Sequence, residues 1–263
     1  MIYDCFPFFN EFELLNLRLH ELDSVVDRFV LVEADTTHSG KPKEYLFNDR
    51  REFFGKWGHK IIAVKTSLPQ NEPPHKREQH QRQMIWNAML QIGAKPSDTI
   101  LMSDVDEIPA AGAVANMLNF VYRGDIAFSQ EIYQYYLNLK VGSNWLGTRM
   151  TRVGLIQEKN WDMHFFRHKV PTLVAEKSGW HFGFMGGAER VKKKIESYMH
   201  VEYDHPEFTD LSKITRRIEQ GKDPFDRTVP LDDSCNKVVG LECMPAYVRE
   251  NPEVFTQWLK PTI

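Results

Sequence analysis

The chain has 263 residues, of which 42% are hydrophobic, 26% charged and 12% aromatic. This composition is typical of a globular protein with a substantial core, and it excludes a fibrous or intrinsically disordered chain. The formal net charge of -3 gives no reason to expect nucleic acid or an anionic membrane as a partner. The basic run from Lys192 to Lys194 is therefore expected to be a solvated helix face.

The cysteines and the N-terminus indicate the compartment. Cys5, Cys235 and Cys243 are odd in number and show no C-x-x-C spacing, so neither a disulfide framework nor a zinc site is predicted. The apolar segment from Met1 to Phe9 is too short for a membrane span or a signal-peptide core, and it contains Asp4. We expect a cytoplasmic protein without a transmembrane segment.

The first 105 residues alternate between strand and helix patterns. A continuous apolar run predicts a strand at 29–32, and short segments rich in apolar residues predict strands at 2–6, 60–64 and 99–102. Apolar residues at helical spacing predict helices at 12–22 and 77–92. This alternation predicts an α/β fold with a mostly parallel, Rossmann-like sheet flanked by helices. In such sheets the ligand binds beyond the carboxyl ends of the strands.

The second half has a different pattern. Two long segments rich in aromatic and β-branched residues, 126–139 and 145–156, predict extended strands separated by a turn at 142–144. Helices are expected at 188–199 and 210–219, and a terminal helix near 252–259. We therefore expect a mixed α+β region after the parallel sheet.

An acidic motif, Asp104 to Glu107, follows the fourth predicted strand. Residues two apart in an ideal strand face the same side, so Asp104 and Asp106 can both point into the ligand crevice. Mn²⁺ and Mg²⁺ take hard oxygen ligands and leave positions for substrate phosphates, so this pair is expected to hold such an ion. The alternative is an ordinary turn or helix N-cap, but Ile108 and Pro109 are expected to open the next helix.

Several sequence segments carry a family resemblance. They are FFNEFELLNLRLHEL from Phe8 to Leu22, VDRFVLVEADTTHSGKPK from Val26 to Lys43, MSDVDEIP from Met102 to Pro109, SGWHF from Ser178 to Phe182, and the stretch 218–226. Over most of residues 3–230 the chain resembles glycosyltransferase family 17. The resemblance implies a GT-A type fold, a UDP-sugar donor, Mn²⁺ dependence and inversion at the anomeric carbon. We expect one domain over 1–263, with a nucleotide-sugar-binding half at 1–109 and an acceptor-side half at 110–263.

Further side chains are candidates for the donor site, together with Asp104. Glu11 opens a helix after the first strand, where it would bind a nucleoside hydroxyl or complement the helix dipole. Glu33 ends the second strand before a polar loop suited to uridine or ribose, the alternative being a solvated turn. Arg82, which resembles a family arginine, would bind diphosphate or sugar oxygens, or else form a surface ion pair with Glu78.

Two histidines compete for the third metal position. GT-A enzymes commonly add a C-terminal histidine to the metal site, and the resemblance favours His181 within SGWHF. His200 is the alternative. A histidine among aromatic neighbours is otherwise more often a hydrogen-bonded core residue.

An inverting displacement needs a base that takes the proton of the acceptor hydroxyl. Glu189 and Asp226 are the candidates, and Glu107 and Asp162 remain open. Glu189 has a simpler explanation as a favourable charge in the first turn of a helix.

The predicted function is transfer of a sugar, expected to be N-acetylglucosamine, from a UDP-sugar to a hydroxyl of a glycan or glycoconjugate. Aromatic side chains could stack on this carbohydrate acceptor or pack in the sheet: Tyr133, Tyr135, Tyr136 and Trp145. The alternatives are a metal-dependent hydrolase acting on a sugar or phosphate, and a non-catalytic carbohydrate-binding protein with the same fold.

Overall fold

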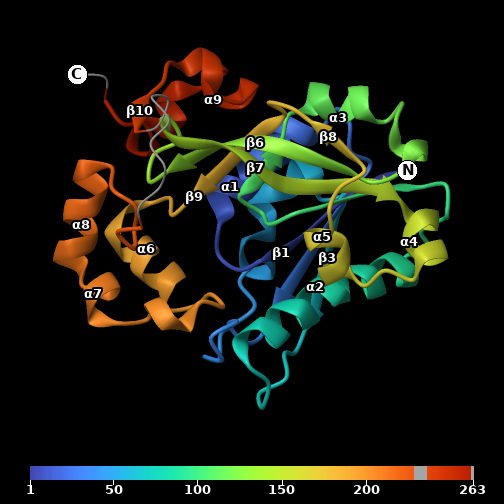
Figure 1. Cartoon of the computed structure of the whole chain (residues 1–263), viewed down its shortest axis with the longest axis horizontal. Helices are drawn as coiled ribbons and strands as arrows, with labels where there is room; N and C mark the ends of the chain where they lie inside the picture. The colour runs from blue at the N-terminus through green and yellow to red at the C-terminus, as the bar shows by residue number, and fades with distance from the viewer. Residues whose placement is uncertain (228–235, 262–263) are drawn as a thin grey trace.

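The computed structural model describes residues 1–227 and 236–261, so Cys235 lies outside the described residues. A ten-stranded sheet forms its centre, with the strand order β3-β2-β1-β4-β7-β6-β9-β5 and with β8 and β10 at the sides of β6 and β7 (Figure 1). The strands are β1 (Ile2–Phe8), β2 (Arg28–Ala34), β3 (Ile61–Thr66), β4 (Thr99–Met102), β5 (Glu107–Pro109), β6 (Ile126–Gln134), β7 (Leu139–Arg152), β8 (Leu173–Ala175), β9 (Gly179–Gly183) and β10 (Lys237–Val238).

The first four strands form a parallel unit in the order β3-β2-β1-β4. Helix α1 (Phe12–Leu22) connects β1 to β2, and α2 (Pro74–Gln91) connects β3 to β4. The predicted strands and helices of this half are confirmed, and the 3-10 helix η1 (Asn48–Trp57) before β3 is an addition. The architecture is α/β with a Rossmann-like parallel half, as expected.

The second half continues the same sheet with antiparallel pairs. β7 pairs antiparallel with β4 and with β6, while β6 pairs parallel with β9. The helices and 3-10 segments of this half are α3 (Ala111–Met117), η2 (Val121–Arg123), α4 (Val153–Lys159), α5 (Met163–His168), α6 (Gly187–Ile195), η3 (Val201–Tyr203), α7 (Pro206–Thr209), α8 (Leu211–Gln220), η4 (Leu241–Cys243), α9 (Ala246–Glu250) and η5 (Pro252–Trp258).

The turn predicted at 142–144 is wrong, because β7 runs through these residues and the chain reverses at 135–138. The β6–β7 register shifts beside this segment, and Asn144 has a φ of 63°. Gly-Ser-Asn therefore marks an irregular, bulged stretch of a long strand. The predicted second strand also ends early, at Arg152, and the last predicted helix is the 3-10 segment η5.

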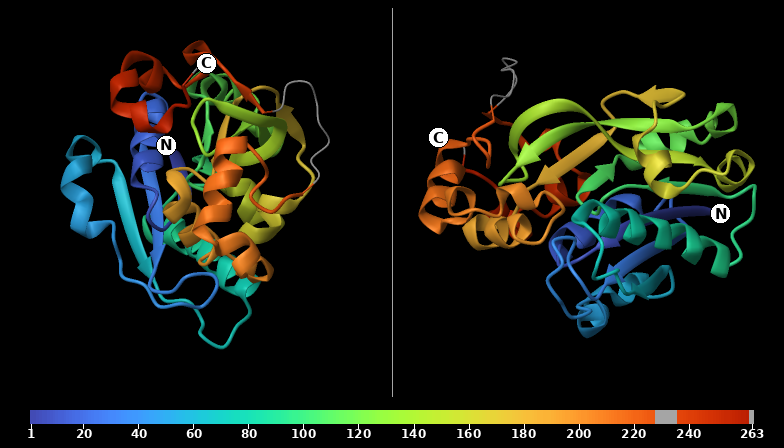
Figure 2. Two further views of the ribbon diagram at one scale, coloured as in Figure 1. Left: turned by 90° about the vertical axis from the view of Figure 1, so that its left-hand side faces the viewer. Right: turned by 60° about the horizontal axis from the view of Figure 1, so that its bottom comes forward.

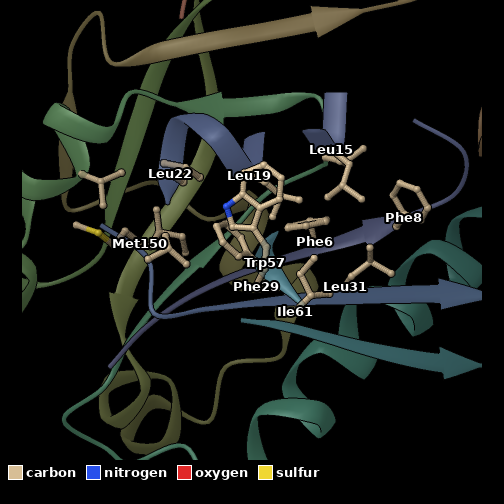
Figure 3. Close-up of a cluster of buried hydrophobic side chains, with 14 of the residues drawn as sticks. Phe6, Phe8, Leu15, Leu19, Leu22, Phe29, Leu31, Trp57, Ile61 and Met150 are labelled. Carbon is tan, nitrogen blue, oxygen red and sulfur yellow. The ribbon is translucent and has the colours of Figure 1, made fainter. Parts of the chain in front are cut away.

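The two faces of the parallel unit are covered by different helices. Phe6 and Phe8 of β1 point to the face that α1 covers, where they join Leu15, Leu19 and Leu22 in one buried cluster (Figure 3). Tyr3 and Cys5 of the same strand point to the opposite face, which α2 covers with Ile85, Ala88 and Met89. These contacts bury an apolar layer on each side of the sheet and fix the carboxyl ends of β1 and β4.

The C-terminal elements complete one end of the molecule. Helices α6 and α8 pack on each other, and both lie at the same end of the sheet (Figure 1). The last segment returns to the N-terminal half (Figure 2). There Val248, Phe255 and Trp258 join Leu14 and Leu17 of α1 in one buried cluster. Within the described residues, the structure contains no helix with both the length and the apolar character to cross a membrane.

Candidate functional site

A cavity of about 1130 Å³ opens beyond the carboxyl ends of β1 and β4. Its walls include the loop after β1, the loop after β2, the acidic motif, β9 and helix α6. Glu11, Asp104, Asp106 and His181 all line it, so the structure brings these predicted site residues to one place.

The acidic motif forms a turn, which corrects the expectation that it extends the strand. β4 ends at Met102, and the Asp104 amide donates to Glu107 Oε2 at 2.8 Å while the Glu107 amide donates to the Asp104 carbonyl at 3.0 Å. Glu107 then begins the short strand β5, so Pro109 lies in a strand and helix α3 starts only at Ala111. The tight turn brings both aspartates to the cavity, without the alternation of an extended strand.

The pairing of β5 with β9 brings His181 to this turn. His181 lies opposite Glu107 in the antiparallel register, and the Phe182 amide donates to the Asp106 carbonyl at 2.8 Å. His181 Nε2 is 3.9 Å from Asp106 Oδ2, and its ring stacks on Trp145 with centroids 4.8 Å apart. Gly179 permits the pairing, since its φ is +153° and a Cβ there would lie 2.3 Å from the Ile108 carbonyl oxygen.

Arg82 binds Asp104 from behind the cavity. Its Nη2 atom is 2.8 Å from Asp104 Oδ1 and 3.0 Å from Glu78 Oε1. Arg82 therefore does pair with Glu78, but not at the surface, since its side chain is 3% exposed. The same guanidinium group also binds Asp104 of the acidic motif. Burial raises the pKa of Asp104, but the charges of Arg82 and Arg167 outweigh this and hold that pKa well below its usual range.

Arg18, which the sequence analysis did not single out, supports the motif from beneath. Its guanidinium donates to both carboxylate oxygens of Asp4 at 2.6 Å, and both side chains are fully buried. The same group donates to Ser103 Oγ at 2.6 Å and to the carbonyls of Asp104 and Glu107 at 3.0 and 2.8 Å. A single buried cation thus fixes the backbone of the acidic turn.

The basic run from Lys192 to Lys194 is not a fully solvated helix face as expected, because Lys194 contacts the acidic motif. It lies on α6 beside the buried Val191 and Ile195, lines the cavity, and places Nζ 2.7 Å from Asp106 Oδ2. Burial lowers the pKa of Lys194, but the carboxylates of Asp106 and Glu11 outweigh it and raise that pKa above the ordinary value. The sequence signal was its position three residues after Val191, on the inner side of the helix.

The donor atoms at the turn fit a divalent ion of the Mn²⁺ or Mg²⁺ type. Asp104 and Asp106 offer carboxylate oxygens, and His181 offers Nε2 beside them. His181 Nδ1 is buried and has no hydrogen-bond partner in the described part of the chain. Across residues 1–227 and 236–261, no three His, Cys, Asp or Glu side chains stand preassembled around one ion position. Binding of an ion between Asp106 and His181 would therefore require the Lys194 ammonium group to leave Asp106.

Glu11 and Glu33 have different roles in the structure. Glu11 lines the cavity, and its Oε2 atom accepts from the amides of Phe9 and Asn10 at 3.2 and 3.0 Å. Glu33 is buried and is not among the described residues of the cavity wall; it accepts from the Leu46 amide at 2.6 Å. Glu33 thus anchors the polar loop after β2, and the loop itself reaches the cavity.

The loop after β2 contributes a histidine that the sequence analysis missed. His38 lines the cavity with Thr36 and Thr37, and its Nε2 atom is 2.7 Å from Gln81 Oε1. Gln81 donates its own Nε2 to the Val32 carbonyl at 2.8 Å, so its oxygen faces the histidine. His38 Nε2 is then the donor of this pair, and burial lowers the pKa of His38, which favours the neutral ring. The DTTHSG sequence after a strand was the available signal.

Three of the four base candidates are not among the described residues that line the cavity: Glu189, Asp226 and Asp162. Glu189 is exposed in the first turn of α6, which agrees with its simpler explanation as a helix-terminal charge. Asp226 pairs with Arg217 at 2.5 Å, and Asp162 caps α5 by accepting from the Phe165 amide at 2.7 Å. Among the four candidates, Glu107 does line the cavity. Its Oε1 atom is bound by Trp145 Nε1 at 2.6 Å and by Arg167.

The remaining candidates divide between the cavity and the core. His200 lines the cavity and places Nδ1 2.8 Å from Glu202 Oε1. Trp145 is 40% exposed on the cavity wall, whereas Tyr135 is buried and donates its hydroxyl to the Lys222 carbonyl at 2.9 Å. Tyr133 packs against Phe182 and also borders the cavity, and Tyr136 packs against the α6–α8 cluster.

Comparison with known proteins identifies the family. The family model described as glycosyltransferase family 17 matches residues 1–251. The chain belongs to glycosyltransferase family 17. Within this family it is similar to the human and mouse proteins named β-1,4-mannosyl-glycoprotein 4-β-N-acetylglucosaminyltransferase, with 32% and 31% identity over 118 residues. Each match covers 40% of this chain and 21% of the relative, so the matched segment spans about a fifth of those proteins.

Solved structures give weaker likenesses. The chain is similar to a 4-diphosphocytidyl-2C-methyl-D-erythritol synthase from Anaerococcus prevotii, with 9% identity, a TM-score of 0.40, and coverage of 68% of this chain and 87% of that chain. It is also similar to a UDP-glucose pyrophosphorylase complexed with UDP-glucose, with 10% identity, a TM-score of 0.35, and coverage of 68% and 92%. The fold assignment of this family 17 member therefore rests on its own sheet topology.

Proposed function

We propose that this protein is an inverting, metal-dependent glycosyltransferase that moves a sugar from a UDP-sugar to a hydroxyl of a glycan or glycoconjugate. The observation that carries the proposal is the meeting of Asp104, Asp106 and His181 on one wall of a large cavity, beyond the carboxyl ends of the parallel strands. This is where α/β sheets of this kind bind nucleotides. The name of the curated relatives favours N-acetylglucosamine as the transferred sugar.

In this proposal, each group of residues has a role that follows from its position in the site. Asp104, Asp106 and His181 would hold Mn²⁺ or Mg²⁺, which neutralises charge on a departing diphosphate when bound. Arg82 keeps Asp104 ionised, and Arg18 fixes the turn that carries both aspartates. The loop with Thr36, Thr37 and His38 supplies polar groups for the nucleoside.

The transfer step is a single displacement at the anomeric carbon. The bond between the anomeric carbon and the diphosphate oxygen breaks, and its electron pair stays on that oxygen of UDP. The acceptor hydroxyl oxygen forms the new bond to the anomeric carbon, and its proton passes to a base. Trp145 offers an exposed aromatic face on the same wall for a sugar ring.

The test is a panel of nucleotide sugars assayed for UDP release with and without Mn²⁺ and carbohydrate acceptors. We expect release that requires the metal, is fastest with UDP-N-acetylglucosamine, and yields a glycosylated acceptor. UDP release at the same rate without an acceptor, with free sugar as the other product, would instead show a hydrolase. Absence of release from every donor would overturn the proposal.

A further inference from the structure

Lys194 places a positive charge in the cavity, next to the acidic turn. Its Nζ atom is 2.7 Å from Asp106 Oδ2, and its side chain, which lines the cavity, is 32% exposed. The Phe184 ring supports it, with Nζ 5.3 Å from the ring centroid. Glu11 and Asp104 line the same cavity. The ammonium group therefore contacts one carboxylate of the acidic turn and shares the cavity with two more.

The same carboxylate oxygen is the one that a divalent ion would use. Asp106 Oδ2 lies 3.9 Å from His181 Nε2, so this oxygen and this nitrogen are the pair positioned to share an ion. An ammonium group within hydrogen-bond distance of that oxygen competes with the ion, because two cations at such short range repel each other strongly. Lysine is suited to move away, since a flexible four-carbon stem carries its charge.

A diphosphate would remove this competition. It brings negative charge that can accept a hydrogen bond from Lys194 while it also binds the metal ion. The neighbouring lysines of α6 have other positions: Lys193 lies over the Phe9 ring at 5.2 Å, and Lys192 is half-buried. Position 194 thus differs from the rest of the basic run by its contact with the motif.

We propose that Lys194 is a diphosphate-binding residue that competes with the divalent ion for Asp106 until the nucleotide is bound. The inference rests on the proposed function, and it adds that binding of the metal ion and binding of the nucleotide are coupled. Metal binds weakly alone and tightly with UDP, because UDP draws the ammonium group off Asp106. By linkage, Mn²⁺ must then raise the affinity for UDP by the same factor.

Isothermal titration calorimetry of the whole chain tests this with Mn²⁺ alone, UDP alone, and each in the presence of the other. The variants are Lys194→Met and Lys194→Gln, with Lys192→Met as the control that removes one charge from the same helix. We expect both Lys194 variants to bind Mn²⁺ alone about tenfold more tightly and UDP about tenfold more weakly, within the usual range of such couplings. The control should match the wild type in both.

The outcomes separate the two proposals. A wild type that binds neither Mn²⁺ nor UDP overturns the proposed function together with this inference. A wild type that binds both, with Lys194 variants whose Mn²⁺ affinity is unchanged or weaker, overturns the role of Lys194 alone. Unchanged UDP affinity in the two Lys194 variants also overturns it. The two variants share the lost charge and differ in polarity, so a folded protein from either suffices.

Discussion

Replacing Arg18 by methionine should destabilise the protein strongly. The change leaves the fully buried Asp4 carboxylate without its cation, and it removes the donor from Ser103 Oγ and from the carbonyls of Asp104 and Glu107. Removing one partner of a buried ion pair costs about 3–5 kcal/mol, because an uncompensated charge stays in the core. For a chain of this size, that corresponds to a fall in melting temperature of roughly 6–20 °C.

Denaturant unfolding followed by circular dichroism measures this loss for Arg18→Met and for the double variant Asp4→Leu/Arg18→Met. The double variant should recover part of the stability, because it removes the unpaired carboxylate. Recovery should be incomplete, since the carbonyls of the acidic turn still lack their donor. A single variant that loses less than about 1 kcal/mol, or a double variant no more stable than the single, would refute the role given to Arg18.

Further predictions concern the acidic turn and the candidate base Glu189. Asp106→Ala should abolish Mn²⁺-dependent UDP release; full activity would show that Asp106 is not a metal ligand. Glu189→Gln should keep the wild-type rate of UDP release and change stability by less than about 0.5 kcal/mol, since Glu189 is exposed at a helix start; a large loss of rate would restore it as the base. The pKa of Asp104 is held below its unfolded value of about 3.9, so its contribution to stability is complete above that pH and is lost as pH falls through the folded pKa. The difference in melting temperature between wild type and Asp104→Asn should therefore stay constant from pH 7 to 5 and shrink below about pH 4; a difference that already shrinks between pH 7 and 5 would contradict the depressed pKa.

The parallel half of the fold was predictable from the sequence because its physical signals are local. The run at 99–102 has three apolar residues after Thr99, and β4 occupies these residues; apolar residues at helical spacing likewise marked α1 and α2. Each of these segments is buried against a neighbour of the same unit, so pattern and burial agree. The ends of the strands then placed Asp104 and Glu11 correctly at the cavity.

The second half was less predictable because its turns depend on tertiary contacts. Gly142 and Asn144 have the composition of a turn, but strand β7 continues through them against β6. Pro109 was expected to start a helix, whereas pairing with Gly179 of β9 holds it in a strand. Such pairings join residues far apart in the sequence, and no local pattern encodes them.

The contacts of charged residues with the acidic motif could not be predicted for the same reason. Arg18 lies within an amphipathic helix pattern, where an arginine normally faces solvent, but a polar β1 residue, Asp4, gives it a buried partner. Lys194 lies in a basic run whose average character is solvated. The choice of His181 over His200 came from the family resemblance, and the β5–β9 register gives the geometry beside Asp106.

The central claim is that Asp104, Asp106 and His181 bind UDP through a divalent ion, and thermal unfolding tests it most directly. UDP with Mn²⁺ should raise the melting temperature of the wild type, and the stabilisation should grow with the logarithm of the ligand excess, reaching about 2.7 kcal/mol at a hundredfold excess over Kd. UDP without metal should give a much smaller shift, and Asp106→Asn should lose the metal-dependent part. No shift of the wild type at millimolar UDP and Mn²⁺, or an equal shift in Asp106→Asn, would contradict the account.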